Sequence, residues 1–141
     1  MMLAAKIYQT ENDEVMVLSQ RECEEVMPSA AAIRLLADRR SGVGADRVLL
    51  FTGTQREPSF LVFAADGTEL RPEAQDYQIL VRYLAEEHIA ANPAELARVF
   101  GANTFLEAFA ARSVTSIEVR LTDCFVRRLA GVAQGLGQAA A

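Results

Sequence analysis

The residues that could transfer protons or attack a substrate lie at two expected helix starts. Glu73 follows Pro72, and Cys124 follows Asp123 where a strand meets a helix. A buried Glu can act as a general acid or base, because burial raises its pKa toward neutrality. A Cys in a first helical turn can act as a nucleophile, because the helix dipole lowers the pKa of its thiol. Both residues are therefore candidate catalytic groups.

Each candidate also has a structural interpretation, which the sequence favours. A Glu in the first turn of a helix stabilises that helix through its charge. No His or Lys lies near Cys124 in the sequence and no glycines follow it directly, so we expect a packed thiol, as is common for Cys. Cys23 lies among carboxylates, which raise the pKa of a thiol, and we interpret it as unreactive.

A further pattern is the glycine-containing loop of residues 39–46, Arg-Arg-Ser-Gly-Val-Gly-Ala-Asp. Gly42 and Gly44 permit a positive φ or a close backbone approach, and Asp46 can accept hydrogen bonds from backbone amides of the turn. A phosphate cradle is the alternative, but the loop has neither the GxGxxG nor the GxxxxGK[ST] pattern. We therefore interpret Gly42, Gly44 and Asp46 as a structural loop.

The elements that must position these residues follow from hydrophobic periodicity and turn signals. A helix over residues 73–90 carries an apolar stripe that we expect to face a sheet. Its members are Tyr77, Leu80, Val81, Leu84 and His88. The other predicted helices span 29–37, 94–100, 103–111 and 123–138, and the predicted strands span 3–8, 14–18, 47–52, 59–64, 68–70 and 114–121. These elements predict an α+β fold with one domain over residues 1–141, ending in a frayed tail at 135–141.

Composition excludes several classes of function. A net charge of −5 and a pI near 4.9 argue against nucleic-acid or anionic-lipid partners, which attract clustered Lys and Arg. We expect a cytoplasmic chain with no membrane span, because there is neither a signal-like segment nor a run of about 20 apolar residues. Two cysteines far apart and a single His indicate no disulfide framework and no metal site. No cofactor is expected.

The segment 35–84 resembles the diaminopimelate epimerase family in the order and spacing of its motifs. The loop at 37–46 matches the family's RRxGVGAD loop, residues 63–69 match its NADG turn, and residues 81–84 match the helix that follows. A weaker similarity covers residues 6–8 and the pair Asn12-Asp13, where the family carries its opening strand and a substrate-contacting Asn-Asp pair. The resemblance implies a mixed sheet wrapped around, or packed by, a long helix, forming half of the family's two-lobed body.

The residues that carry the family's chemistry are replaced. The family uses a pair of cysteines, and the first heads a CGNG turn at a helix start; an ungapped alignment places Glu73-Ala74-Gln75-Asp76 there. Glu73 and Asp76 would repel an anion from the positive helix end, where the family's Gly-rich turn offers free N–H groups to a substrate carboxylate. Ala64 replaces the substrate-binding Asn of the NADG turn, which leaves a polar group of the substrate unpaired at a cost of ~1–3 kcal/mol.

The resemblance leads to a leading hypothesis and alternatives. The chain has the length of one family lobe, so we expect it to pair with a second copy as a homodimer or with a second protein subunit. The leading hypothesis is a non-catalytic binding or accessory protein, with an amino-acid-like small molecule as a further possible ligand. The residues expected at its ligand-binding face are Asn12, Asp66, Gly67, Thr68, Glu73, Gln75 and Asp76.

Two alternatives come from other classes of protein. The first is a small isomerase, cyclase or lyase of specialised amino-acid metabolism that uses Glu73 as an acid or base, with Cys124 or Asp66 assisting. The second is a structural subunit whose helices at 94–111 and 123–138 dock onto a larger enzyme. Composition alone does not separate docking of this kind from self-association.

Overall fold

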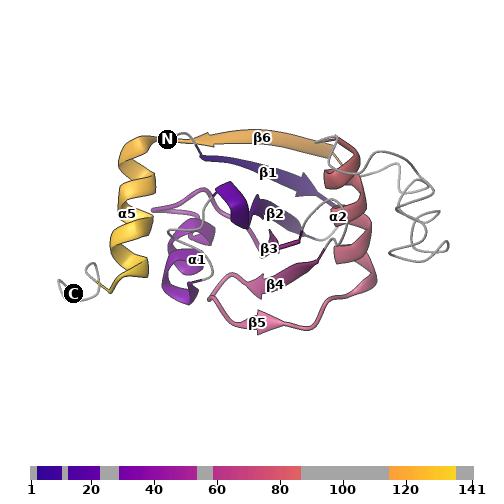
Figure 1. Ribbon diagram of the computed structural model, residues 1–141, viewed down its shortest axis with the longest axis horizontal. Coiled ribbons are helices and arrows are strands. Elements are labelled where there is room, and N and C mark those ends of the chain that lie inside the picture. The colour runs from indigo at the N-terminus through magenta and orange to yellow at the C-terminus, as the bar shows by residue number, and fades with distance from the viewer. Residues whose placement is uncertain (1–2, 11–12, 23–28, 54–58, 87–114, 136–141) are drawn as a thin grey trace.

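The computed structural model describes residues 3–10, 13–22, 29–53, 59–86 and 115–135. Its centre is a mixed six-stranded sheet in the order β5-β4-β3-β2-β1-β6 (Figure 1). β2 and β3 are parallel, and all other neighbours are antiparallel. The strands are β1 (Leu3–Gln9), β2 (Glu14–Ser19), β3 (Arg47–Phe51), β4 (Phe60–Ala64), β5 (Glu69–Leu70) and β6 (Thr115–Leu121). The predicted α+β class, with a mixed sheet packed by helices, is confirmed.

The two faces of the sheet carry separate hydrophobic cores. Successive strand residues point to opposite faces, so Met16 and Leu18 enter the first core while Val15 and Val17 enter the second. The first core lies under the helices α1 (Ala30–Ala37) and α5 (Asp123–Ala133). The second core lies under α2 (Ala74–Glu86). Apolar residues at nearly every position of the central strands therefore serve both faces.

Local caps fix where the helices of the first core begin. Ser29 accepts a hydrogen bond from the amide of Ala32 at the start of α1, and Thr122 accepts one from Phe125 at the start of α5. These side chains satisfy backbone amides that a helix start otherwise leaves unpaired. α5 ends at Ala133 rather than at the predicted residue 138, because Gly135 takes a positive φ of 82° just beyond it. A left-handed residue at this position is a common end of a helix.

The buried face of α2 differs from the predicted stripe by about one residue. Leu80 and Leu84 are buried as predicted, but Tyr77 is only half-buried and its place is taken by Asp76, with Ile79 and Tyr83 also buried. The prediction counted apolar residues only, whereas the structure buries a carboxylate. His88 of the predicted stripe lies outside the described residues, as do the predicted helices 94–100 and 103–111.

The remaining described element is a short 3-10 helix, η1 (Gln20–Glu22), which follows β2. At the far end of α2, Glu86 accepts hydrogen bonds from Lys6 and Tyr8 of β1.

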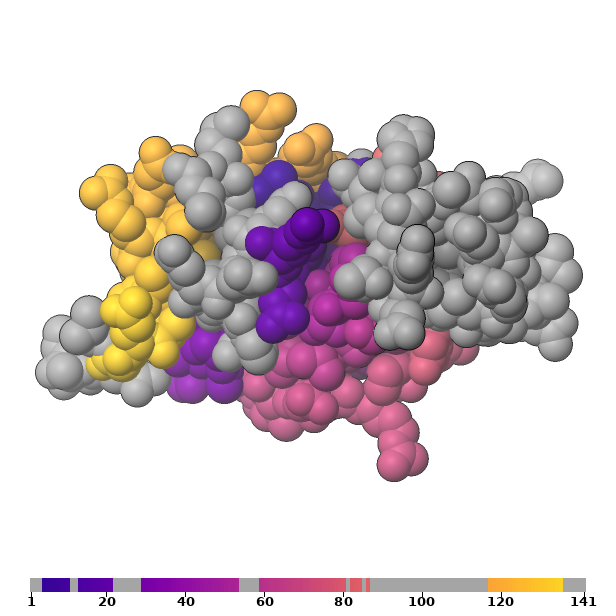
Figure 2. Space-filling model, viewed as in Figure 1, coloured from indigo at the N-terminus to yellow at the C-terminus, as the bar shows by residue number. Residues whose placement is uncertain are grey.

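β6 forms one rim of the sheet, visible as the orange residues along the top of the space-filling view (Figure 2). None of the helices in the described part of the chain is both long and apolar enough to cross a membrane.

Candidate functional site

The candidate site lies at one end of the central strands. β1 ends where β2 begins, with Gln9 opposite Glu14. β3 begins beside β2, and its first residue, Arg47, lies opposite Ala64, the last residue of β4. These pairings bring the turn after β1, the start of β3 and the turn after β4 together at one end of the strands. This end of the sheet is called the site's edge below. These segments are the regions in which the resemblance places the Asn-Asp pair and the NADG turn.

The start of α2 belongs to the same edge and is closed by its own side chains. Asp76 accepts a hydrogen bond from the Glu73 amide at 2.8 Å, while the Asp76 and Tyr77 amides donate back to the Glu73 carbonyl. This is one half of a capping box, in which the side chain of the third helical residue reaches back to the amide of the residue that precedes the helix. The Glu73 amide is therefore occupied by the protein itself.

Asp76 also forms a buried ion pair with Arg47. The guanidinium donates two hydrogen bonds, from Nε at 3.2 Å and from Nη2 at 2.6 Å. The side chain of Asp76 is 1% exposed and that of Arg47 is 16% exposed. The hydrogen bonds from Arg47 to Asp76 raise the pKa of the Arg47 guanidinium. The pair therefore ties the start of α2 to the first residue of β3.

Sequence reasoning missed Arg47, although its position carried a signal. Arg47 opens the otherwise apolar strand of residues 47–51. A cation at the first position of a buried strand requires a partner, because an unpaired charge is costly to bury. The partner lies 29 residues away in the sequence. The sequence predicted that Glu73 and Asp76 would both repel an anion at this helix start. Because Arg47 compensates the charge of Asp76, only Glu73 is left of these two to repel it.

Gln75 connects the start of α2 to the turn between β1 and β2. Its amide nitrogen donates to Thr10 Oγ1 at 3.0 Å. Thr10 also closes its own turn, because its amide donates to the Asp13 carbonyl and its hydroxyl accepts from the Asp13 amide. Asn12, predicted at the ligand-binding face, lies outside the described residues.

The turn after β4 packs against the start of α1. Asp66 accepts a hydrogen bond from the Thr68 amide at 2.9 Å, and this bond lowers the pKa of the Asp66 carboxyl. Gly67 has a φ of +92°, and a Cβ at this position would lie 2.5 Å from the Ala30 carbonyl oxygen. Asp66 and Thr68 are exposed. The turn therefore presents polar groups to solvent while its glycine is fixed by packing.

The loop at residues 39–46 joins α1 to the site's edge of the sheet. Gly44 has a φ of +94°, and Gly42 lies so close to the carbonyl groups of α1 that a side chain would collide with the Leu35 carbonyl. Asp46 accepts from the Glu14 amide at 2.8 Å and from Arg39 Nη2 at 3.0 Å. The loop thus makes internal contacts that hold the beginnings of β2 and β3 together.

The structure separates the predicted catalytic candidates. The Glu73 side chain is exposed, so the burial on which its use as an acid or base depended is absent. The expectation of a packed Cys124 is wrong, because its thiol is free and exposed. α5 presents a single fully buried residue, Leu129, and Cys124 lies off that face. Cys124 and Glu73 lie at the starts of helices that cover opposite faces of the sheet (Figure 1).

The charge at the site is mainly negative. Arg47 lies within the electrostatic reach of Glu73 and Asp13 as well as Asp76. Arg47 therefore faces three carboxylates, and at the same strand ends Arg39 pairs with Asp46 and Glu14. Across the described ranges, no group of three or more His, Cys, Asp and Glu side chains is arranged to hold a metal ion.

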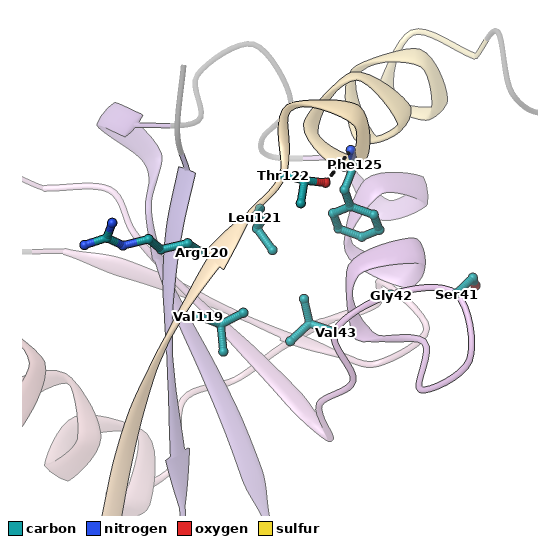
Figure 3. A pocket seen from close by; sticks show the side chains of 8 residues that line it. All are labelled: Ser41, Gly42, Val43, Val119, Arg120, Leu121, Thr122 and Phe125. Carbon is teal, nitrogen blue, oxygen red and sulfur yellow. Dashed lines mark hydrogen bonds between the residues drawn. The ribbon is translucent and has the colours of Figure 1, made fainter.

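A shallow pocket of about 260 Å³ lies away from this edge, between the loop at 41–43 and the junction of β6 with α5 (Figure 3). Val43, Val119 and Phe125 supply much of its apolar lining. Figure 3 shows Arg120 pointing away from the pocket on the other face of β6.

Comparison with known proteins supports the resemblance over part of the chain. No protein-family model matches. The chain is 38% identical to the diaminopimelate epimerase of Alkalilimnicola ehrlichii over 76 residues, which are 52% of this chain and 26% of that protein. It is 35% identical to the diaminopimelate epimerase of Halorhodospira halophila over 83 residues, covering 57% and 28%. The matched segment thus spans little more than a quarter of these curated relatives. Over about half of its own length, the chain is related to the diaminopimelate epimerases.

Proposed function

We propose that this chain is a non-catalytic, epimerase-like binding or accessory protein that pairs with a second copy of itself or with another protein subunit. The observation that carries the proposal is the start of α2, where Asp76 caps the helix internally and pairs with Arg47. In the motif that the chain resembles, this position offers a thiol and a Gly-rich turn to the substrate. Here it carries Glu73, and the side chain of Asp76 occupies the Glu73 amide.

The placement of the thiols supports the same proposal. A two-thiol mechanism requires one cysteine on each side of the reacting carbon. Cys124 begins α5 over the first core, whereas the candidate site lies at the start of α2 over the second core. Cys124 therefore does not face the site from within one chain, and Cys23 lies outside the described residues.

The charge at the site indicates what kind of small molecule it would accept. Glu73 and Asp13 add to Asp76 around a single Arg47, so the edge attracts a cation more strongly than an anion. We infer that an amino-acid-like ligand would approach with its ammonium group toward Glu73. This polarity is opposite to that of a helix start that receives a carboxylate.

The alternative function is an isomerase, cyclase or lyase with Glu73 as its acid or base. Glu73 is exposed and lies beside the Gln75–Thr10 contact, so in this alternative a bound ligand would have to supply the burial that the structure does not give to Glu73. An exposed carboxylate can take a proton from a ligand that covers it. Asp66 is the other exposed carboxylate of the turn after β4, and it would serve as the assisting group.

Exchange of substrate α-protons with solvent separates the two functions. The purified chain is incubated in D₂O with diaminopimelate and a panel of amino acids, and deuterium at the α-carbon is followed by NMR. We expect no exchange above the buffer rate, with an active diaminopimelate epimerase as the positive control. Exchange that Glu73→Gln abolishes and Glu69→Gln preserves would refute the non-catalytic proposal and establish the alternative.

Binding is tested separately from chemistry. Ammonium-bearing ligands are titrated into the wild-type chain and into Glu73→Gln while the melting temperature is measured. Glu69→Gln, an exposed Glu on β5, serves as the matched control. We expect Glu73→Gln to lose ligand-induced stabilisation and Glu69→Gln to keep it. Equal responses in all three proteins would remove Glu73 from the binding site.

A further inference from the structure

β6 is one of the two outer strands of the described sheet, and β5 is the other. β6 pairs with β1 along its whole length, from Leu3 opposite Leu121 to Gln9 opposite Thr115. Within the described ranges, no strand lies on its other side. Unpaired backbone groups on such an edge form a template for another strand.

The side chains along this edge are unusual for a protected edge strand. Ile117 is 63% exposed and is the large apolar residue that stands out on the described surface. It shares a strand face with Val119 and Leu121, which border the apolar pocket (Figure 3). Glu118 and Arg120 are exposed on the opposite face. Edge strands that avoid pairing usually carry a proline, a bulge or an inward-pointing charge.

We propose that the occupant of this edge is β6 of a second copy, paired antiparallel about a two-fold axis at Val119. In that register Glu118 of each chain lies opposite Arg120 of the other, so two opposite-charge pairs form. Directly opposed residues in an antiparallel pair have Cβ atoms about 4.5–5.5 Å apart, and opposite charges there are favourable. The self-association in the proposed function is the basis of this inference, which adds the surface and the register.

The charges select this register over its neighbours. A two-fold axis perpendicular to the sheet keeps the Ile117 face of both copies on the same side. Residues of the same face then lie opposite one another, so the axis must pass through a residue, and the neighbouring registers have their axes at residues 118 and 120. An axis at residue 118 places Glu118 opposite Glu118, and an axis at residue 120 places Arg120 opposite Arg120. Like charges directly opposed are unfavourable. Only the axis at Val119 pairs both charges with their opposites.

The apolar face of β6 fits the same register. Ile117 of the second copy lies opposite Leu121, at the border of the pocket formed with Val43 and Phe125. The exposed Ile117 of each chain thereby gains an apolar neighbour on the other chain, and burial of apolar surface favours association. The sheet continues across the two copies without a change of face.

Charge reversal tests the register. Glu118→Arg and Arg120→Glu each place like charges opposite one another, and the double variant Glu118→Arg/Arg120→Glu restores opposite pairs. We expect each single variant to weaken the dimer roughly 10- to 30-fold and the double variant to return to within about threefold of wild type. The dissociation constant is measured by sedimentation equilibrium. Glu69→Arg, on the opposite rim of the sheet at β5, is the control and leaves the dimer unchanged.

Cross-linking gives an independent readout of the axis. Cys23 and Cys124 are replaced by Ser, and a single Cys is introduced at residue 117 or 119. Cys at 119 should form an intermolecular disulfide under mild oxidation, because the axis brings this residue against itself at a separation that a disulfide spans. Cys at 117 should not. Circular dichroism of each variant confirms the fold.

The outcomes distinguish this inference from the proposed function. A dimer that ignores the charge reversals and does not cross-link at 119 uses another surface; this refutes the β6 pairing and leaves self-association intact. A chain that stays monomeric and binds only a different protein refutes the second copy as occupant and supports the accessory-subunit form of the proposed function. Loss in the single variants with rescue in the double variant establishes the pairing.

Discussion

The buried pair between Arg47 and Asp76 predicts a large loss of stability from a small change. Asp76→Asn keeps the size and shape of the side chain but removes its charge. The Asp76 side chain is 1% exposed and the Arg47 side chain 16% exposed, so the variant leaves a cation largely buried without its partner. Removing one member of a buried pair costs about 3–5 kcal/mol. The partial exposure of Arg47 and the nearby Glu73 and Asp13 reduce the expected cost to roughly 2–4 kcal/mol.

The assay is reversible unfolding in urea, with thermal melting as a second readout. For a chain of this size the expected loss corresponds to a decrease of roughly 5–12 °C in melting temperature. The double variant Arg47→Met/Asp76→Leu removes both charges, and we expect it to recover most of the loss, because a buried ion pair is often replaceable by apolar residues. The lost cap at Glu73 keeps that recovery incomplete by about 0.5–2 kcal/mol.

A matched control uses an exposed ion pair in the same protein. Arg39 and Asp46 form a salt bridge with both side chains largely exposed, and Arg39→Met should change the free energy of unfolding far less than Asp76→Asn. If Asp76→Asn lost as little stability as Arg39→Met, the buried pair would be solvated in solution and the reasoning from burial would be refuted. An Asp76→Asn protein no less stable than the double variant would show that removing Arg47 brings no recovery, so an unpaired buried cation would not be the cause of the loss.

Three further predictions concern turns and caps. Gly67→Ala should lower the free energy of unfolding by about 2 kcal/mol or more in urea titration, because φ is +92° and the new Cβ meets the Ala30 carbonyl; a neutral result would mean that the turn shifts freely. Thr122→Ala should cost about 0.5–2 kcal/mol through loss of the α5 cap, whereas Thr68→Ala, at a position that caps no helix, should cost less. The Asp38 carboxyl accepts hydrogen bonds from the amides of Arg40 and Ser41, which lower its pKa below 3.8. Its stabilisation is therefore complete above about pH 4 and is lost as the pH falls through the folded-state pKa, so Asp38→Asn should flatten the acid limb of a pH titration of stability.

The sheet was predictable from the sequence because its strands are short apolar runs bounded by turn residues. The neighbouring strands β3 and β4 fall within one residue of the predicted runs 47–52 and 59–64. The start of α1 was likewise readable from Ser29, whose hydroxyl caps the helix. In each case the information is local, since a few neighbouring residues determine both the element and its end.

The buried face of α2 and the exposure of Cys124 were not predicted because they depend on contacts between distant segments. A stripe drawn from apolar residues excludes Asp76, and only its contact with Arg47 on β3 explains why the carboxylate is buried. For Cys124 the error is the opposite one, because a residue expected to be buried is exposed. The frequency with which cysteines are buried suggested a packed thiol, but α5 meets the first core through Leu129 and leaves the first turn exposed.

The sequence named the residues of the candidate site but not their arrangement, and their binding of a ligand stays a prediction. The turns near Asp13 and Asp66 and the start of α2 meet at the edge of the sheet at which the resemblance placed them. What the sequence did not reveal is that Gln75 and Asp76 point inward to Thr10 and Arg47. Residues expected to contact a ligand therefore also hold the edge together.

In the proposed function, this dual use would couple ligand binding to stability. A helix start can offer its amides to a ligand or to its own side chains, and the amide of Glu73 is given to Asp76. Freeing that amide for an anion requires Asp76 to turn away, and Arg47 would then lose the carboxylate that compensates its charge. Binding of an anionic ligand would therefore have to compensate for both the lost cap and the lost ion pair. A cationic group can approach the exposed Glu73 while both remain intact. The cap and the ion pair together therefore favour an ammonium-bearing ligand over a carboxylate at this edge.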